Sequence, residues 1–268
     1  MSKERNETTM TSKRIASLFY GAACYAVFLA TFLYTIGFIG NLGVPNSIDS
    51  TPQIPLGPAV LVDTLLLGVF ALQHSVMARQ WFKRGLTKMI SPAIERSTYV
   101  LLSSLALALM FWKWQPIEGM VWNVENSTGR VLIYSAYAFG WVTVLVATFL
   151  INHFDLFGLR QVWFYLLGKQ YQAPGFRTPG LYAYVRHPLY LGWLFVFWST
   201  PVMTTAHLLF AAATTAYILI AIQFEERDLR SFHRQYVDYS RRVPMLIPGF
   251  TRRSSEARGA VSQASGRG

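Results

Sequence analysis

Charged residues are scarce in this chain, and cysteine is nearly absent. Only 14% of the 268 residues are Asp, Glu, Lys or Arg, while 53% are hydrophobic and the mean hydropathy is positive. Soluble domains carry about 25% charged residues, so this composition excludes an ordinary soluble domain and indicates an integral membrane protein. The single cysteine, Cys24, can form no internal disulfide, and no Cys-x-x-Cys pair or Cys/His cluster predicts a zinc site.

Acidic residues are also few, and the formal net charge is +11. A basic chain can bind nucleic acid when its charges gather on one face. Here the charges are confined to the ends of apolar runs, so we exclude nucleic acid as a partner. We expect the lipid bilayer to be the partner instead, with the Arg-rich C-terminal tail touching anionic lipid.

Six apolar runs are long enough to cross a bilayer or nearly so, because a helical crossing needs about 20 residues. The runs are Ile15–Ile39, Gly57–Ala78, Tyr99–Trp112, Val131–His153, Pro188–Met203 and Ala206–Phe224. The third and fifth are short, and the last two alternatively form a hairpin that turns near Pro201. The first is much longer than the apolar region of a signal peptide, so we interpret it as a membrane helix. The predicted fold is an all-α polytopic membrane helix bundle of five to six transmembrane helices, with a cytosolic C-terminal helix that begins at Arg227.

Composition divides the chain into four regions. Residues 1–14 form a cytosolic N-terminal tail, residues 15–154 hold the N-terminal membrane helices, residues 155–250 form a ligand-binding region with the helical hairpin, and residues 251–268 form a basic tail. The polar stretches 1–13 and 252–268 are predicted to be disordered. Residues 155–187 are too polar to cross but rich in aromatic side chains, so we place them at the membrane interface.

Lysine and arginine determine the predicted orientation. With the N-terminus inside, 22 of the 24 Lys and Arg residues lie in inner segments, and only Lys113 and Arg130 lie outside. Positive residues favour the cytoplasmic side, so this asymmetry predicts an even number of crossings with both termini in the cytoplasm. We expect the membrane to be a bacterial inner membrane.

With this orientation, each polar residue can be assigned a depth in the membrane. His74, the segment 152–155, Arg186-His187 and Glu225-Glu226 all fall in the cytosolic third of the membrane. Ionisable groups inside a membrane are costly, so they indicate a functional site by default. His207 falls at the outer end and His233 in the tail, and we exclude both from this site.

The segment 180–192 is polar and basic although it opens an apolar run. Pro188 favours the first turn of a helix, which puts Arg186-His187 just before a helix N-terminus. Such a position binds anions, including a carboxylate. The pair Glu225-Glu226 closes the next apolar run and can hold a cation. Together the two segments predict a ligand that is an amino acid with an additional positive charge.

The pattern Tyr-x-x-x-Arg-His-Pro-x-Tyr-x-Gly over residues 182–192 is followed by the two glutamates and by Tyr-x-x-Tyr-x-x-Arg-Val-Pro over residues 236–244. Over residues 171–250 the chain resembles the isoprenylcysteine carboxyl methyltransferase and phospholipid methyltransferase superfamily. The segment 72–79, Leu-Gln-His-Ser-Val-Met-Ala-Arg, is more similar to the bacterial branch that contains methanethiol S-methyltransferases and NnrU-type proteins, and the former are the nearest match. The resemblance implies a helical membrane enzyme that uses S-adenosylmethionine from the cytosol to convert methanethiol to dimethyl sulfide.

The resemblance places the cofactor on the two segments identified above. The residues expected to contact it are Tyr182, Tyr184, Arg186, His187, Pro188, Tyr190, Gly192, Glu225, Glu226 and Arg242. The cofactor's carboxylate suits the Arg-His pair and the helix N-terminus, and its ammonium suits a glutamate. Tyr190 is expected to stack on adenine or bond the ligand, and Gly192 to leave room for close approach. The Gly-x-Gly-x-x-Gly fingerprint is absent, which excludes the plan of the soluble methyltransferases.

Methylation of a small thiol favours a base near the sulfur, because such a thiol is mostly protonated at neutral pH. His74 and His153 are the candidate bases, with Asp155 as an orienting partner. Each histidine has a structural alternative, since His74 can be a hydrogen-bonded core residue and His153 an interface residue. No metal ligand is expected.

Three alternatives to a small-thiol methyltransferase stay open. An isoprenylcysteine or phospholipid substrate would need a tunnel open to lipid, whereas a small closed cavity favours methanethiol. A membrane reductase shares an Arg-His-x-x-Tyr-x-Gly segment, but it needs NADPH contacts and a larger sterol-binding part than this short chain offers. The third alternative is a non-enzymatic membrane protein or a small transporter.

Overall fold

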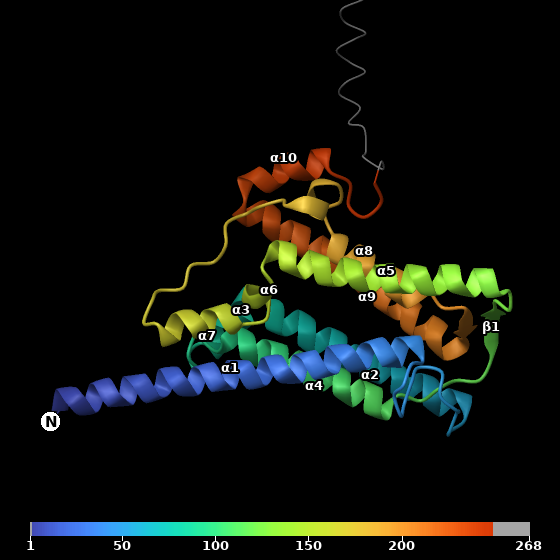
Figure 1. Cartoon of the computed structure of the whole chain (residues 1–268), viewed down its shortest axis with the longest axis horizontal. Coiled ribbons are helices and arrows are strands. Elements are labelled where there is room, and N and C mark those ends of the chain that lie inside the picture. Colours follow the sequence, from blue (N-terminus) through green and yellow to red (C-terminus); the bar gives the residue numbers. More distant parts are fainter. Residues whose placement is uncertain (1, 249–268) are drawn as a thin grey trace, which may run out of the picture.

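The computed structural model describes residues 2–248, and its regular structure is almost entirely helical (Figure 1). The elements in chain order are α1 (Ser2–Gly40), α2 (Leu56–Ala78), α3 (Gln80–Leu86), α4 (Glu95–Lys113), β1 (Met120–Asn123), α5 (Ser127–Ile151), α6 (His153–Leu156), α7 (Leu159–Leu166), the 3-10 turn η1 (Gly180–Ala183), α8 (Pro188–Trp198), β2 (Val202–Thr204), α9 (Thr205–Phe232) and α10 (Arg234–Arg242). This arrangement confirms the predicted all-α membrane bundle.

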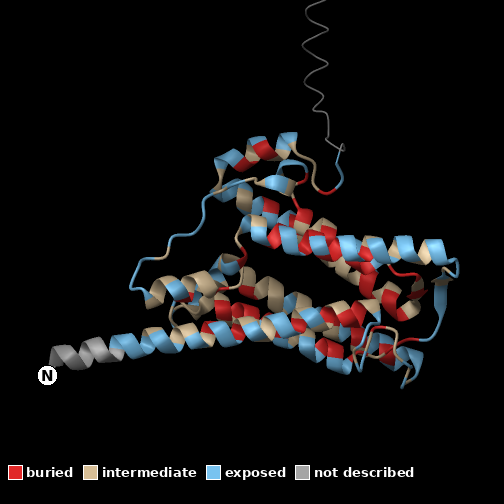
Figure 2. Cartoon of the chain, in the orientation of Figure 1, coloured by how far each residue is buried: buried red, intermediate tan, exposed pale blue. Residues whose placement is uncertain are grey.

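Five helices are long and apolar enough to cross a bilayer, namely α1, α2, α4, α5 and α9. Many of their large apolar side chains are exposed on the outside of the bundle, including Leu61, Leu65 and Leu72 on α2 (Figure 2). A soluble surface rarely exposes a continuous apolar area of this kind. The exposed leucines are therefore explained by lipid contact, and the protein is an integral membrane protein.

The helices form two groups in Figure 1, with α1, α2 and α4 in one and α5, α8 and α9 in the other. One apolar core joins the groups, since Phe38, Phe111, Trp141 and Phe210 belong to a single buried cluster. The helix α10 and the start of α8 lie at one end of the bundle, which we call the α10 end. The antiparallel pair β1–β2 closes the other end, which we call the sheet end.

The fifth predicted crossing differs from the prediction. Helix α8 ends at Trp198, so its 11 residues extend only about 16 Å, roughly half of a bilayer core. The chain continues through Pro201 without helical structure, and β2 then pairs with β1, which lies in the connection between α4 and α5. The α8 segment therefore still reaches the sheet end, although its helical part is too short to cross.

Two predicted helix boundaries are corrected. Helix α9 does not stop at Phe224 but continues to Phe232, so both glutamates lie inside it. The C-terminal helix accordingly begins at Arg234, after a break at His233, and not at Arg227. The last two turns of α9 carry charged residues because they lie beyond the apolar layer, in polar surroundings.

The N-terminal tail also differs from the prediction. Helix α1 begins at Ser2, so residues 2–13 are helical and continue the first crossing, whereas the sequence predicted disorder. The predicted disordered basic tail, residues 251–268, lies outside the described residues.

Helices α5 and α8 pack closely at a pair of glycines. A Cβ atom placed on Gly192 would lie 2.9 Å from the carbonyl oxygen of Gly140 and 2.9 Å from the backbone nitrogen of Val144. Since no side chain fits there, Gly192 allows the backbones of the two helices to touch. Gly192 thus allows close approach of α5, and its predicted contact with a cofactor stays a prediction.

Candidate functional site at the α10 end

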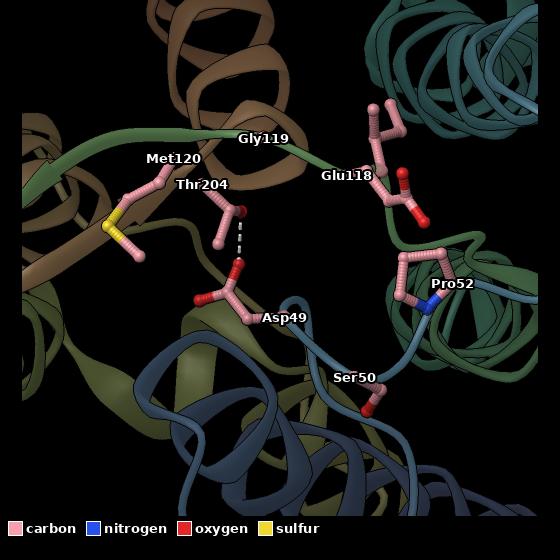
Figure 3. Close-up of a pocket in the computed structure, with 8 residues that line it drawn as sticks. Asp49, Ser50, Pro52, Glu118, Gly119, Met120 and Thr204 are labelled. Atoms are coloured by element: carbon pink, nitrogen blue, oxygen red, sulfur yellow. Dashed lines mark hydrogen bonds between the residues drawn. The ribbon is translucent and has the colours of Figure 1, made fainter.

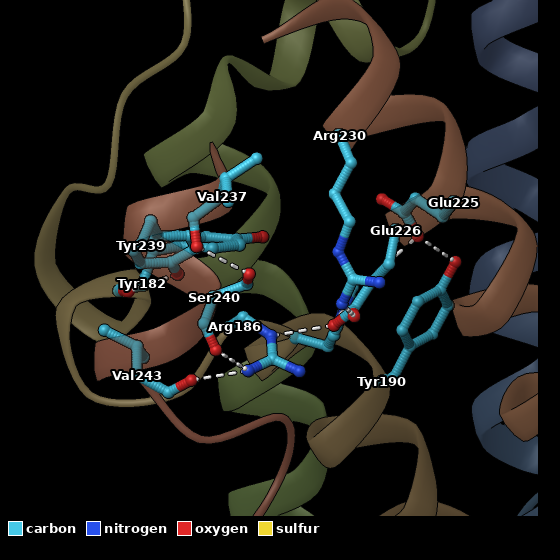
Figure 4. A network of polar contacts seen from close by, with 11 residues as sticks. Tyr182, Arg186, Tyr190, Glu225, Glu226, Arg230, Val237, Tyr239, Ser240 and Val243 are labelled. Atoms are coloured by element: carbon cyan, nitrogen blue, oxygen red, sulfur yellow. Dashed lines mark hydrogen bonds and ion pairs between the residues drawn. The ribbon is translucent and has the colours of Figure 1, made fainter. Parts of the chain in front are cut away.

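A cluster of charged side chains joins the start of α8, the last turns of α9 and α10 (Figure 4). Arg186, two residues before α8, is at its centre. Its Nε donates to Oε1 of Glu226 at 2.7 Å, and its Nη1 donates to the carbonyls of Ser240 and Val243 at 2.8 and 2.6 Å. The guanidinium thus fastens the end of α10 to α9, a structural contact that the predicted anion-binding role did not include.

Glu226 is the acidic partner of this arginine, and both of its oxygens are engaged. Oε1 lies 3.2 Å from Nε2 of His187 as well as accepting from Arg186, and Oε2 accepts from Arg230 at 2.8 Å. The Glu226 side chain is only 9% exposed. A buried carboxylate with three donors has little capacity for a further cation, so Glu226 organises the cluster.

Glu225 faces the other side of the cluster and is more open. Its Oε2 accepts from the hydroxyl of Tyr190 at 2.9 Å and lies 3.9 Å from Nδ1 of His187. The Glu225 side chain is 45% exposed, five times the exposure of its neighbour. Figure 4 shows the Tyr190 ring rising from α8 toward this carboxylate. Of the two predicted glutamates, Glu225 therefore has the capacity to hold a ligand cation.

Two tyrosine hydroxyls lie buried beside the glutamates. The hydroxyls of Tyr182 and Tyr236 have no hydrogen-bond partner among residues 2–248. Burial raises the pKa of Tyr182, and the charge of Glu225 raises it further, while burial and the charge of Glu226 raise the pKa of Tyr236. Both hydroxyls are therefore protonated donors at neutral pH. Buried polar groups are rarely unpaired, which marks these two as candidate ligand contacts.

The N-terminus of α8 is built as the sequence predicted. Pro188 occupies its first turn and is buried, and His187 is the residue before it. The backbone N–H groups of Arg186 and His187 donate to the carbonyls of Pro244 and Met245 at 2.9 and 3.1 Å. These bonds hold the segment after α10 against the start of α8, and the next N–H groups of α8 have no acceptor within the helix.

His74 belongs to α2 and faces α4, and it does not contact the glutamates. The hydroxyl of Tyr99 is 2.9 Å from its Nε2 and 3.0 Å from its Nδ1, and Ser103 Oγ is 3.2 Å from Nδ1. Each ring nitrogen therefore has a hydroxyl within hydrogen-bond distance, which also fits the structural alternative for His74. Phe70 stacks on the His74 ring with centroids 5.3 Å apart and also meets the Tyr217 ring of α9 at 6.3 Å.

His153, the other candidate base, has both ring nitrogens occupied. Its Nε2 lies 2.8 Å from the hydroxyl of Tyr25, and its Nδ1 lies 3.0 Å from Thr148 Oγ1. Thr148 donates its own proton to the carbonyl of Leu145, so it accepts from Nδ1, and Tyr25 then donates to Nε2. Burial lowers the pKa of His153. A neutral ring whose lone pair is occupied favours the structural alternative for His153.

Asp155 does not contact either histidine. Its Oδ1 accepts from the hydroxyl of Tyr171 at 2.7 Å and from Arg160 at 3.4 Å. Burial, and then the hydrogen bond to Asp155, raise the pKa of Tyr171 to about 12. Asp155 therefore ties α6 to the segment after α7, in place of the predicted orienting contact to a histidine.

Two predicted cofactor residues lie apart from the cluster. Tyr184 follows η1 and is 70% exposed. Arg242 is exposed on α10, where its Nε donates to the carbonyl of Asp238 one turn earlier. The structure thus brings together the residues before and within α8 and the two glutamates, and leaves Tyr184 and Arg242 at the surface.

The sheet end holds a separate hollow of about 280 Å³ (Figure 3). It is lined by Asp49, Ser50, Pro52, Ile117, Glu118, Gly119, Met120 and Thr204. Asp49 accepts from Thr204, and its Oδ2 lies 3.5 Å from Nδ1 of the buried His207. Burial raises the pKa of Asp49, but the hydrogen bonds from His207 and Thr204 outweigh it and keep the pKa below its usual range. This pair lies at the sheet end. His207 is therefore away from the charged cluster, in agreement with the outer position predicted for it.

Sequence reasoning missed several members of these networks. The pairing of Arg230 with Glu226 was predictable, because the two residues are four apart on a helix and that spacing brings opposite charges together. Tyr236 was part of the quoted C-terminal motif but received no role. Tyr99 and Tyr25 had no local signal, because each meets its histidine from a helix far away in the sequence.

Several known proteins of similar sequence are named methanethiol S-methyltransferase. The chain is 54% identical over 255 residues to a methanethiol S-methyltransferase of Crocosphaera subtropica, which covers 95% of this chain and all of that protein. It is 53% identical to a methanethiol S-methyltransferase of Mycobacterium tuberculosis, over 88% of this chain and 97% of that protein. Nurim of Xenopus laevis is more distant, at 27% identity over 72% of each chain. No family model and no solved structure matches the chain.

Proposed function

This chain belongs to the methanethiol S-methyltransferase family and is a membrane methyltransferase, and we propose that it methylates methanethiol to dimethyl sulfide with S-adenosylmethionine as the donor. The observation that carries the proposal is the meeting of Glu225 with the start of α8 at one end of the bundle. An open carboxylate beside a helix N-terminus suits a ligand with both an ammonium and a carboxylate.

The side chains of the cluster fit this donor. The carboxylate of Glu225 is suited to its ammonium, and the N–H groups in the first turn of α8 are suited to its carboxylate. The unpaired hydroxyls of Tyr182 and Tyr236 are two further donors for its polar atoms. Arg186 acts indirectly, because it holds Glu226 and the end of α10 in place around these contacts. When bound, S-adenosylmethionine supplies a methyl group on a positively charged sulfur.

The acceptor must lose a proton as its sulfur gains the methyl group. The products are dimethyl sulfide, S-adenosylhomocysteine and one proton, so the S–H bond breaks as the new S–C bond forms. We assign this proton to His74, because its ring lies within the apolar bundle beside Tyr99 and Ser103, whereas His153 lies beyond the end of α5.

The proposed orientation places the α10 end in the cytoplasm of a bacterial cell, at the inner membrane. Supporting it, Arg186 and Arg230 lie at that end, together with the basic helix α10. Positive residues concentrate on the cytoplasmic side of membrane proteins. This orientation gives the site direct access to a cytosolic methyl donor.

The test uses the purified full chain with methyl-labelled S-adenosylmethionine. We expect labelled dimethyl sulfide from methanethiol, little or no product from a prenylcysteine, and binding of S-adenosylhomocysteine but not of NADPH in calorimetry. His74→Ala should lower kcat by about 10²- to 10⁴-fold and leave S-adenosylhomocysteine affinity unchanged. Transfer to the prenylcysteine alone, or binding of NADPH alone, would overturn the proposal.

A further inference from the structure

A lipid-facing groove lies between α2 and α9 near the α10 end and is distinct from the charged cluster. Its volume is about 230 Å³, and it is lined by Ser75, Val76, Arg79, Tyr217, Ile220, Ala221 and Phe224. Ile220 and Phe224 are 57% and 48% exposed on a helix that is long and apolar enough to cross the membrane. The groove therefore opens sideways into the hydrocarbon layer.

The groove has apolar walls, a hydroxyl floor and a charged rim. At the floor, Ser75 Oγ and the hydroxyl of Tyr217 are 3.1 Å apart and hydrogen-bonded. At the rim, Arg79 lies over the ring of Phe224 at 5.2 Å, and its Nη1 is 3.3 Å from Asp228. The charged groups at the rim are paired with each other, so the groove offers a ligand apolar walls and two hydroxyls. These surfaces suit an uncharged molecule with one weakly polar atom.

The floor of the groove adjoins the residues to which we assign the chemistry. Ser75 directly follows His74 in α2. Phe70 stacks on the His74 ring with centroids 5.3 Å apart and meets the Tyr217 ring at 6.3 Å, so Tyr217 lies near the candidate base. The two hydroxyls at the floor thus lie near the candidate base.

We propose that this groove is the entrance and binding site for the methyl acceptor, a small uncharged alkyl thiol that arrives from the lipid. The inference rests on the proposed function. A water molecule occupies about 30 Å³, so a thiol with two heavy atoms fits a groove of this volume with room to turn. The Ser75–Tyr217 pair receives the S–H group, and the apolar walls receive the alkyl group. Thiols that carry a charge are excluded because a charged group does not cross hydrocarbon readily.

Ala221 is the position at which to block the groove, since its side chain is small and lines the wall. We expect Ala221→Trp to raise the KM for methanethiol at least tenfold, with kcat and S-adenosylhomocysteine affinity changed less than twofold. Leu219→Trp is the matched control, because Leu219 is 42% exposed on the same helix but does not line the groove. It should keep the wild-type KM.

A labelling experiment avoids the risk that a tryptophan disturbs folding. Ala221→Cys is made in a Cys24→Ala background, folded, and then labelled with N-ethylmaleimide, with Leu219→Cys as the control. Labelling at position 221 should raise the KM for methanethiol at least tenfold relative to the same protein before labelling, and labelling at position 219 should not.

The outcomes separate this inference from the function on which it rests. If the wild-type protein transfers no methyl group to methanethiol, the proposed function fails. If the wild-type protein is active and both labelled proteins keep an unchanged KM, the function stands and the α2–α9 entrance is wrong. A fall in kcat or in S-adenosylhomocysteine affinity at unchanged KM would likewise overturn the entrance, because it would place Ala221 in another role.

Discussion

Neighbouring glutamates on α9 have different surroundings. The carboxylate of Glu226 is buried and meets Arg186, Arg230 and His187, whereas the carboxylate of Glu225 is half-exposed and meets a tyrosine. A buried ion pair is costly to break, because the remaining charge stays out of water without its partner. An exposed carboxylate with one neutral donor has no such structural role. We therefore assign Glu226 to the fold and propose Glu225 as the ligand contact.

Exchanging each glutamate for glutamine separates these roles. Glu225→Gln should weaken S-adenosylhomocysteine binding tenfold or more, equivalent to about 1.4 kcal/mol, because the neutral amide no longer attracts an ammonium. Its thermal unfolding midpoint should change little. Glu226→Gln should lower the midpoint instead, since removing one partner of a buried pair costs about 3–5 kcal/mol. Calorimetry and thermal unfolding of both variants measure the two effects, and equal loss of affinity at unchanged stability in both would contradict this assignment.

Sequence patterns located the cluster but did not assign every role within it. The Arg-His-Pro segment and the two glutamates were expected to meet at one depth, and they do. The structural use of Arg186 was not predictable, because its acceptors are backbone carbonyls of Ser240 and Val243. Carbonyl groups leave no signal in a sequence. The hydrogen bond between His153 and Tyr25 was not predictable either, because Tyr25 lies in a different helix.

At the scale of the helices, apolar length predicted the crossings well and the helix ends poorly. Five long spans follow from runs of apolar residues, as hydropathy requires. The ends of α8 and α9 differ because pairing between β1 and β2 draws the chain out of α8 at Trp198, and contacts with Arg186 and Arg230 keep α9 helical past Phe224. The β1–β2 pairing and the Arg186–Glu226 bond join distant segments, whereas Arg230 pairs with Glu226 within α9.

The contact between α5 and α8 offers a test at this scale. Gly192→Ala should destabilise the protein by about 1–3 kcal/mol, since the added methyl group would meet the backbone of Gly140 and Val144 at 2.9 Å. Gly68→Ala in α2 is the matched control, because no atom lies within 4 Å of the position of its added Cβ. Thermal unfolding in detergent compares the two. If Gly192→Ala is as stable as Gly68→Ala, the glycine pair does not determine how these helices pack.

At the scale of the whole molecule, the two ends of the bundle have different chemistry. The sheet end is closed by β1–β2 and by the Asp49–His207 pair, while the α10 end holds the basic residues and the half-exposed Glu225. Since the methyl donor is charged, it must reach its site from water, and the small thiol can arrive through lipid. The proposed mechanism therefore requires the α10 end to face the cytoplasm.

Two exposed glutamines at opposite ends test this orientation. Gln53 lies in the connection before α2 at the sheet end, and Gln235 lies in α10. Gln53→Cys and Gln235→Cys, each in a Cys24→Ala background, are treated with a membrane-impermeant maleimide in spheroplasts. The charge asymmetry predicts labelling of Gln53→Cys at once and of Gln235→Cys only after the membrane is permeabilised. The reverse pattern would place the site outside, away from a cytosolic donor, and immediate labelling of both would require an even number of crossings between them. Either result would contradict the proposed orientation while leaving the packing of the bundle unchanged.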